Sequence, residues 1–259
     1  FHLHSRWTDL IEQRLEWEYP HRRSSEIVSK TSVSELKRRW EFLAAEEEES
    51  SASAPSALRL SKPLLQRPAF LEEREMTPAE RGTLYHLAMQ HLPVGLEGDP
   101  AVIAAELSRL AARGILPIDR LQALEPEVLA RFFRTDLAKR MAASANVWRE
   151  VPFSYGLPAE TLDPGMSMPK TPEDGTEAAP GETVLVQGVI DCVFAEDDGL
   201  VLLDYKTDAV RSETALAGIR DRYALQIDVY ARALAEIWRT PVKEAHLFLF
   251  DTGTSIRMK

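Results

Sequence analysis

Cysteine is almost absent from this chain: Cys192 is the only one in 259 residues. A single thiol cannot form an intrachain disulfide, and it cannot supply the four thiolates of a structural zinc site or an iron–sulfur cluster. Long apolar runs are absent too, because no stretch approaches the roughly 18 consecutive apolar residues that a membrane helix needs. The start also lacks the basic and apolar pattern of a signal peptide. We therefore expect a soluble, cytoplasmic protein with no membrane contact and no iron–sulfur cluster.

Positive charge is in short supply as well. Lys and Arg number 31 against 41 Asp and Glu, which gives a formal net charge of -10. Such a balance disfavours non-specific binding to nucleic acid, because neutralisation of phosphates supplies most of that affinity. The sequence also lacks a glycine-rich loop ending in Gly-Lys-Ser or Gly-Lys-Thr, so we expect no ATP site in this chain. It begins with Phe1 rather than Met, and we expect it to be part of a longer protein.

Composition divides the chain into two parts, with an expected boundary near residue 75. A near-helical apolar spacing over 7–15, an acidic run at 46–49 and a Ser, Ala and Pro-rich stretch at 50–63 indicate a docking helix and a linker within residues 1–75. We expect one compact domain over residues 76–259. Within it, residues 157–182 are rich in Pro, Gly, Thr, Glu and Asp, which is typical of a flexible insertion.

Local signals predict the elements of that domain. Thr77 and Glu80 form a capping-box pattern around Pro78, which predicts a helix that ends at His91 before Pro93. The periodicity of apolar residues predicts further helices over 101–113, 119–124, 126–144 and 213–238, and strands over 148–153, 183–194, 199–205 and 246–250, the first broken by its proline. Helices and strands in this order favour an α/β core.

Two acidic residues and a lysine fall on neighbouring strands of the predicted hairpin. With one turn geometry Asp191 lies opposite Lys206 and diagonal to Asp204, and with another it lies directly opposite Asp204. In both cases the three side chains share one face, whereas an odd-length loop without a bulge would separate them. Direct and diagonal neighbours lie within about 8 Å of each other, so the two carboxylates can approach a single ion.

Two chemical interpretations fit these three residues. Asp204 follows the apolar run 201–203, and burial of an unpaired carboxylate is costly. A divalent cation such as Mg²⁺ or Mn²⁺ would offset that cost, lower the pKa of a bound water and stabilise charge on a phosphoryl oxygen. Lys206 would then orient the attacking water or neutralise developing charge. The alternative is a simple salt bridge between Lys206 and one of the two acids.

Five short motifs occur in order along the chain, each of them weak when taken alone. They are Gly82-x-x-x-His86, Glu150-Val-Pro-Phe153, Gly188-Val-Ile-Asp191, Asp204-Tyr-Lys206 and Gln226-x-x-x-Tyr230. Together they resemble the motifs of the RecB-like nucleases, which belong to the PD-(D/E)XK superfamily, over about residues 77–251. Residues 32–38 and 71–90 further resemble the C-terminal nuclease region of one subunit of the AddAB family of bacterial helicase-nucleases. The resemblance implies an α/β fold with a central mixed sheet flanked by helices.

The resemblance also implies roles for individual residues. It makes His86, Asp191 and Asp204 metal ligands. The main-chain carbonyl of Tyr205 would be a further ligand, and Lys206 would be the catalytic lysine. A lone helical histidine beside leucines is an ordinary packing residue in most proteins. Its place one turn after a glycine, which permits close approach of the helix, favours the ligand interpretation here.

Three further positions match supporting parts of the family pattern. Glu150 matches a supporting acidic position. Gln226 and Tyr230 lie four residues apart and share one face of the expected helix. In the family that face positions DNA and the active-site strand. Ordinary polar groups in helix packing are the alternative interpretation of the pair.

The implied activity is metal-dependent hydrolysis of DNA, with Mg²⁺ as the cofactor and Mn²⁺ as a substitute. The substrate would be single-stranded DNA that a helicase region of the same longer chain produces during double-strand break repair by recombination. A second nuclease subunit would be a partner. Because relatives with an iron–sulfur cluster use four cysteines, this chain would be a member without one.

Two alternatives from other classes stay open. One is a catalytically silent nuclease fold that docks partners or guides DNA, and the other is a freestanding metal enzyme that acts on another phosphate ester. Since the net charge is negative, DNA contact would rely on a local basic surface. The candidate residues for it are Arg131, Arg134, Lys139, Arg140, Arg211 and Arg222.

Overall fold

The computed structural model of the chain describes residues 11–12, 14–16, 28–40, 76–159, 183–210 and 212–259. The chain divides into a smaller unit of residues 1–32 and 155–186 and a larger unit of residues 33–154 and 187–259. Of the expected docking helix, residues 11–12 and 14–15 are helical, and the remainder lies outside the described residues. The stretches 41–75 and 160–182 also lie outside them. The expected linker and insertion therefore stay predictions.

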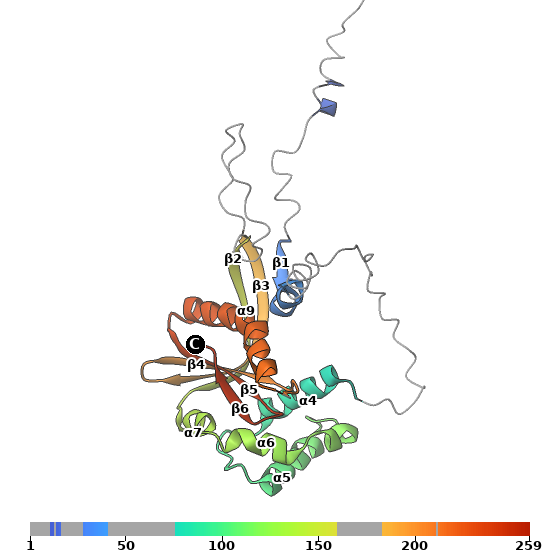
Figure 1. Cartoon of the computed structure of the whole chain (residues 1–259), viewed down its shortest axis with the longest axis vertical. Helices are drawn as coiled ribbons and strands as arrows, with labels where there is room; N and C mark the ends of the chain where they lie inside the picture. The colour runs from blue at the N-terminus through green and yellow to red at the C-terminus, as the bar shows by residue number, and fades with distance from the viewer. Residues whose placement is uncertain (1–10, 13, 17–27, 41–75, 160–182, 211) are drawn as a thin grey trace, which may run out of the picture. The chain divides into compact units, whose positions relative to one another are not determined.

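Six strands of the described part of the chain form one mixed sheet (Figure 1). Neighbours follow the order β1-β3-β4-β5-β6, and β2 pairs with β3. Strands β3 and β4 are antiparallel, β4 and β5 are parallel, and β5 and β6 are antiparallel. The strands are β1 (Lys30–Ser32), β2 (Val147–Pro158), β3 (Thr183–Glu196), β4 (Gly199–Lys206), β5 (Val242–Leu249) and β6 (Thr254–Arg257). This architecture confirms the expected mixed sheet flanked by helices.

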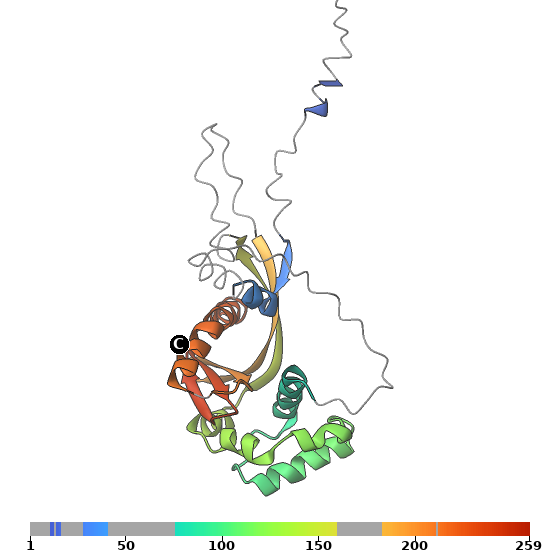
Figure 2. The same ribbon diagram turned by 45° about the vertical axis from the view of Figure 1, so that its right-hand side comes forward.

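In the larger unit, helices lie on both faces of the sheet (Figures 1 and 2). The long helix α9 (Glu213–Trp238) connects the parallel strands β4 and β5, which a tight turn cannot join. The opposite face carries α4 (Pro78–His91), α5 (Pro100–Ala112), the 3-10 helix η1 (Ile118–Ala123), α6 (Pro126–Phe133) and α7 (Asp136–Ala143). Apolar side chains of these helices, such as Leu129 and Phe132, pack with Leu203 and Phe248 of the sheet in one buried core.

Helix α4 begins as its sequence predicts. Thr77 is the N-cap, and its hydroxyl accepts a hydrogen bond from the N–H of Glu80 at 3.2 Å. The Glu80 carboxylate accepts from the N–H of Thr77 at 2.8 Å, which completes the capping box. Pro78 occupies the first turn, where a missing N–H costs no hydrogen bond. These local bonds define where the helix that carries His86 starts.

Three expectations about the helices and strands of the larger unit need correction. The single helix expected over 126–144 is two helices, because Thr135 caps α7 with a bond from the N–H of Ala138 at 3.1 Å. The segment 118–123 is a 3-10 helix rather than an α-helix. The last strand is not 246–250: β5 begins at Val242, and the four-residue strand β6 follows it.

Strand β2 also differs from the expectation that it would break at Pro152. It runs through this proline to Pro158. Among the described strands β2 pairs only with β3, and a strand with one free edge tolerates a residue that has no N–H to donate. The irregular point lies two residues earlier, at Glu150, whose φ is 51°.

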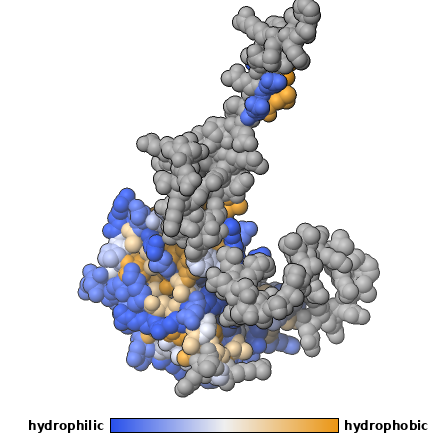
Figure 3. Space-filling view, turned by 45° about the horizontal axis from the view of Figure 1, so that its top comes forward, coloured by the Kyte–Doolittle hydropathy of each residue, from blue (hydrophilic) through white to orange (hydrophobic). Residues whose placement is uncertain are grey.

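The described surface is mainly polar. Figure 3 shows a face on which hydrophilic residues surround a smaller apolar area. Large apolar side chains that are exposed in the larger unit include Val102, Ile118, Trp148, Val189 and Ile237. Of the helices that the structure describes, none combines the length and the hydropathy that a membrane crossing requires.

Candidate active site

The hairpin of β3 and β4 turns at residues 197–198 and pairs Glu196 with Gly199. The ladder continues to the pair of Cys192 and Leu203. This register is the second of the two expected from the sequence. Asp191 and Asp204 follow the last pair of the ladder, at opposite positions on β3 and β4. Beyond that point the pairing changes, because the N–H of Tyr205 donates to Oδ2 of Asp191 at 2.7 Å. The side chain of Asp191 is thereby fixed at the end of the hairpin ladder.

Asp204 is buried, with 1% of its surface exposed. Its Oδ1 accepts a hydrogen bond from Nε2 of Gln226 at 3.0 Å, and its Oδ2 lies 2.5 Å from Nζ of Lys206. Burial raises the pKa of Asp204, and the charge of Lys206 opposes that rise. Burial alone would lower the pKa of Lys206, but the charges of Asp204 and Asp191 and the bond to Asp204 together outweigh it and hold that pKa above its ordinary value. The salt bridge expected from the sequence therefore forms.

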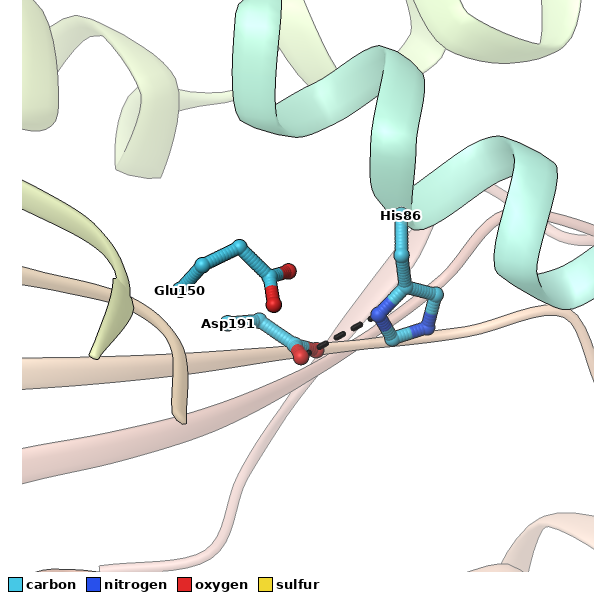
Figure 4. A group of neighbouring side chains, drawn as sticks. All are labelled: His86, Glu150 and Asp191. Carbon is cyan, nitrogen blue, oxygen red and sulfur yellow. Dashed lines mark hydrogen bonds and ion pairs between the residues drawn. The ribbon is translucent and has the colours of Figure 1, made fainter. Parts of the chain in front are cut away.

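His86 reaches Asp191 from helix α4 (Figure 4). Its Nδ1 lies 3.1 Å from Oδ1 of Asp191. One ligand atom from each of His86, Glu150 and Asp191 lies within 4.8 Å of the other two. Burial alone would lower the pKa of His86, but the hydrogen bond and charge of Asp191 raise it above its ordinary value. Burial and the charge of Asp191 both raise the pKa of Glu150.

Backbone geometry contributes to this convergence. Glu150 has a positive φ of 51° inside β2, which is uncommon for a residue other than glycine and occurs often at functional sites. On α4, a Cβ added to Gly82 would lie 3.3 Å from Oγ1 of Thr207, just after β4. A Cβ at this position would be in tighter than ordinary contact with that hydroxyl. The small residue expected one turn before His86 therefore permits the close approach.

Gln226 and Tyr230 lie on the α9 side of the site. Nε2 of Gln226 is also 3.1 Å from the hydroxyl of Tyr230. The ring of Tyr230 packs edge-on against Phe153 with centroids 5.5 Å apart. The fifth motif thus contacts both the acid of the fourth motif, Asp204, and the apolar end of the second.

The Tyr205 side chain is buried against Phe132 and Phe250, with ring centroids 5.4 and 5.7 Å away. Its ring also lies edge-on to that of His86, with centroids 6.3 Å apart. The role expected of Tyr205 concerns its main-chain carbonyl and stays a prediction. The basic surface expected from the sequence is largely engaged with other groups of the chain. Arg134, Lys139, Arg140 and Arg222 pair with acids, Arg131 donates to main-chain carbonyls, and Arg211 lies outside the described residues.

Four further residues support the site and did not emerge from the sequence. Nη1 of Arg149 donates to the carbonyls of Gln90 and Leu92 at the end of α4, at 2.8 and 2.6 Å. Tyr223 lies three residues before Gln226 on α9. This spacing places both residues on one face of the helix and could have identified Tyr223 from the sequence. Lys37, Lys206 and Asp208 all contact Tyr223. No local sequence pattern predicts the contact of Lys37 with Tyr223, because the two residues lie far apart in the sequence.

The donor atoms suit a hard or borderline divalent cation. The His86 imidazole and the carboxylates of Glu150 and Asp191 converge, whereas Asp204 lies outside this group of three. Carboxylate oxygens with imidazole nitrogen are ligands of Mg²⁺, Mn²⁺ and Zn²⁺. The carboxylates of Asp191 and Asp204 are both buried, where a cation offsets the cost of removing their charges from water. Cys192 is not a candidate ligand, because burial raises the pKa of its thiol to about 12 and its Sγ contacts Sδ of Met141.

Comparison with known proteins identifies similar chains. The family model described as the PD-(D/E)XK nuclease superfamily matches residues 56–257. Similar proteins include an ATP-dependent helicase/nuclease subunit from Geobacillus kaustophilus, which is 38% identical over 253 residues covering 95% of this chain and 19% of the relative. The proteins of the same name from Acetivibrio thermocellus and Desulforudis audaxviator are 39% and 41% identical over 250 and 252 residues, which cover 96% and 95% of this chain and 18% and 19% of those relatives.

The chain thus spans about a fifth of the length of these relatives. The matched residues 56–257 contain all five motifs. Their order, the mixed sheet and the family match agree, and the chain belongs to the PD-(D/E)XK nuclease superfamily.

Proposed function

We propose that this chain is a metal-dependent deoxyribonuclease domain that hydrolyses phosphodiester bonds in single-stranded DNA. The observation that carries the proposal is the meeting of three elements at one place. Helix α4 supplies His86, β3 supplies Asp191, and β4 supplies the paired Asp204 and Lys206. A salt bridge at a strand end needs neither the histidine nor a second buried acid.

His86, Asp191 and Asp204 would hold the metal, with Mg²⁺ as the expected ion and Mn²⁺ as a substitute. The main-chain carbonyl of Tyr205 is the fourth proposed ligand. Since its N–H is directed at Asp191, its carbonyl is expected on the same edge of β4. Glu150, which lies within reach of His86 and Asp191, is a supporting acid. The bound ion would lower the pKa of a water and stabilise charge on a phosphoryl oxygen.

The groups of the chain itself would orient the reaction. Nζ of Lys206 donates to the attacking water or to a non-bridging phosphate oxygen, where it neutralises charge that develops during attack. Asp204 fixes the position of Lys206 through the 2.5 Å ion pair. Gln226 in turn fixes Asp204 with its amide. These contacts fix the position of the Lys206 ammonium group before the substrate binds. Such preorganisation is the condition for effective electrostatic catalysis.

The substrate and partners are inferred from the relatives. These relatives are named as an ATP-dependent helicase and nuclease in one protein. A helicase region of the same longer protein would therefore supply the separated DNA strands. The name also describes each relative as one subunit of an assembly, and a second nuclease subunit would be its partner. With the likeness to AddAB helicase-nucleases, this favours a cytoplasmic role in double-strand break repair by recombination.

A cleavage assay tests the proposal. End-labelled single-stranded DNA and blunt duplex DNA are incubated with the purified chain in Mg²⁺ or EDTA. Asp204→Asn and Lys206→Met are compared with Asp197→Asn, an exposed acid at the tip of the same hairpin. We expect cleavage of the single strand by wild type and Asp197→Asn in Mg²⁺ alone. Equal cleavage by Asp204→Asn would overturn the site. DNA binding without cleavage by the wild type would favour the silent module instead.

A further inference from the structure

Two lysines from distant parts of the chain contact one aromatic ring beside the site. Nζ of Lys37 lies 3.8 Å from the centroid of the Tyr223 ring, and Nζ of Lys206 lies 4.7 Å from the same centroid. Both distances are within the range of a cation–π contact, which is about 6 Å. The two ammonium nitrogens are therefore no farther apart than the sum of these two distances.

Tyr223 is fixed for this contact. The ring is buried, with 6% of the residue exposed, and its hydroxyl donates to Oδ2 of Asp208 at 2.8 Å. Asp208 also pairs with Arg222 at 3.3 Å. The orientation of the ring is thus set from α9 and from the segment after β4 together. A ring held in this way presents a constant surface to both lysines.

The position of Lys37 is also fixed, because the helix that carries it packs on the larger unit. Residues 33–40 are helical, and Val33 and Leu36 on that helix are buried. A Cβ added to Gly188 of β3 would lie 3.1 Å from a methyl group of Val33. Lys37 lies one turn after Val33 and so shares its face of the helix. The helix is seated on the larger unit by its apolar residues, and this seating directs Lys37 to the ring.

We propose that Lys37 binds the phosphate next to the scissile one, and that Tyr223 is a positioning residue that holds Lys37 and Lys206 for two consecutive phosphates. The inference rests on the proposed function, which places Lys206 at the scissile phosphate. Two ammonium groups on one ring offer a site for two negative groups of one strand. Lys37 would also supply positive charge locally in a chain whose net charge is -10.

The test separates DNA binding from turnover. Affinity for a labelled oligothymidylate is measured in EDTA between low and high salt, and kcat and KM are measured in Mg²⁺. Lys37→Gln should weaken binding about fivefold, lower the slope of log Kd against log salt by about 0.7, as expected for one phosphate contact on a single strand, and raise KM more than it lowers kcat. Arg38→Gln, at the exposed neighbouring position of the same helix, removes an equal charge and should leave the slope unchanged.

The ring is tested with a matched pair. Tyr223→Phe keeps the aromatic face and loses the bond to Asp208, whereas Tyr223→Leu loses the face. We expect Tyr223→Phe to keep most of the affinity and kcat, and Tyr223→Leu to lose both at an unchanged circular dichroism spectrum. An unchanged salt slope in Lys37→Gln, or equal losses in the two Tyr223 variants, would overturn the inference. Because affinity is measured without cleavage, an inactive wild type with a Lys37-dependent slope would refute only the proposed function.

Discussion

Nε2 of Gln226 donates a hydrogen bond to Oδ1 of Asp204 at 3.0 Å, which joins the long helix α9 to the buried acid at the end of β4. Without that donor, one oxygen of a carboxylate that is 1% exposed would lose its partner, and burial of an unsatisfied acceptor is costly. The same amide contacts the hydroxyl of Tyr230. Gln226 thus fixes the orientation of the Asp204 carboxylate.

Replacement of this amide is therefore expected to reduce activity without abolishing the fold. Gln226→Leu should lower kcat or metal affinity about 10- to 100-fold, which is typical of residues that orient metal ligands. Gln226→Glu should be worse, because a second carboxylate would face Asp204. Glu236→Gln, at an exposed position of the same helix, serves as the control. Wild-type cleavage rates for Gln226→Leu at limiting Mg²⁺ would contradict this role.

Metal binding should also be visible as thermal stabilisation. A ligand that binds only the folded chain at 100 times its Kd stabilises it by about 2.7 kcal/mol, which raises Tm by several degrees. We expect Mn²⁺ to raise the Tm of the wild type and of Asp197→Asn but not of Asp191→Asn. Differential scanning fluorimetry with and without Mn²⁺ measures this. An equal shift for Asp191→Asn would mean that the stabilising ion binds elsewhere.

The pH dependence of stability should depend on Arg140, far from the proposed metal. Its guanidinium contacts Glu196 and Glu244 at 2.9 and 2.8 Å, and these bonds lower the pKa of each glutamate to about 2. Because the folded pKa lies below the unfolded value, this stability is present above about pH 4.5 and is lost as pH falls toward about 2.

Arg140→Met should therefore cost about 1–3 kcal/mol near neutral pH, with the lower end favoured because the groups are partly exposed. The difference from the wild type should shrink as pH falls below about 4.5. Urea unfolding at several pH values between 7 and 3.5 measures the difference. A gap between the two proteins that stays constant or grows on acidification would show that the ion pairs are not its source.

The start of α4 should affect both stability and activity. Thr77→Ala removes the oxygen that accepts from Glu80, which is expected to cost about 1 kcal/mol. Because α4 carries His86, fraying of its first turns should also lower the cleavage rate. Thr77→Ser keeps the hydroxyl and should stay close to the wild type in both measurements. Equal unfolding free energies for the Ala and Ser variants would remove the capping box from this explanation.

Local sequence signals predicted the parts of the fold that local bonds determine. The capping box of Thr77 and Glu80 defined the start of α4, and both hairpin registers considered for β3 and β4 placed Asp191, Asp204 and Lys206 on one face. The break between α6 and α7 was missed because Thr135 stands in an apolar pattern that continues across it. Strand β6 is only four residues long, and its pairing with β5 comes from tertiary contacts rather than from its own composition.

For the site, the ordered motifs predicted which residues to examine but not how they meet. The positive φ of Glu150 and its approach to His86 depend on packing between β2 and α4. The contact of Lys37 with Tyr223 joins residues far apart in sequence, so no spacing rule reveals it. The engagement of Arg134 and Arg140 by acids was likewise invisible, because charge alone does not tell which partner a side chain finds.

In the proposed active site, His86, Asp191 and Asp204 together bind one divalent metal ion. The most direct measurement is a crystal structure of the chain grown with Mn²⁺, with anomalous scattering used to locate the ion. We expect a manganese peak bounded by the His86 ring and the carboxylates of Asp191 and Asp204, and no such peak in Asp191→Asn. A wild-type structure in Mn²⁺ with no peak between these three side chains would contradict it.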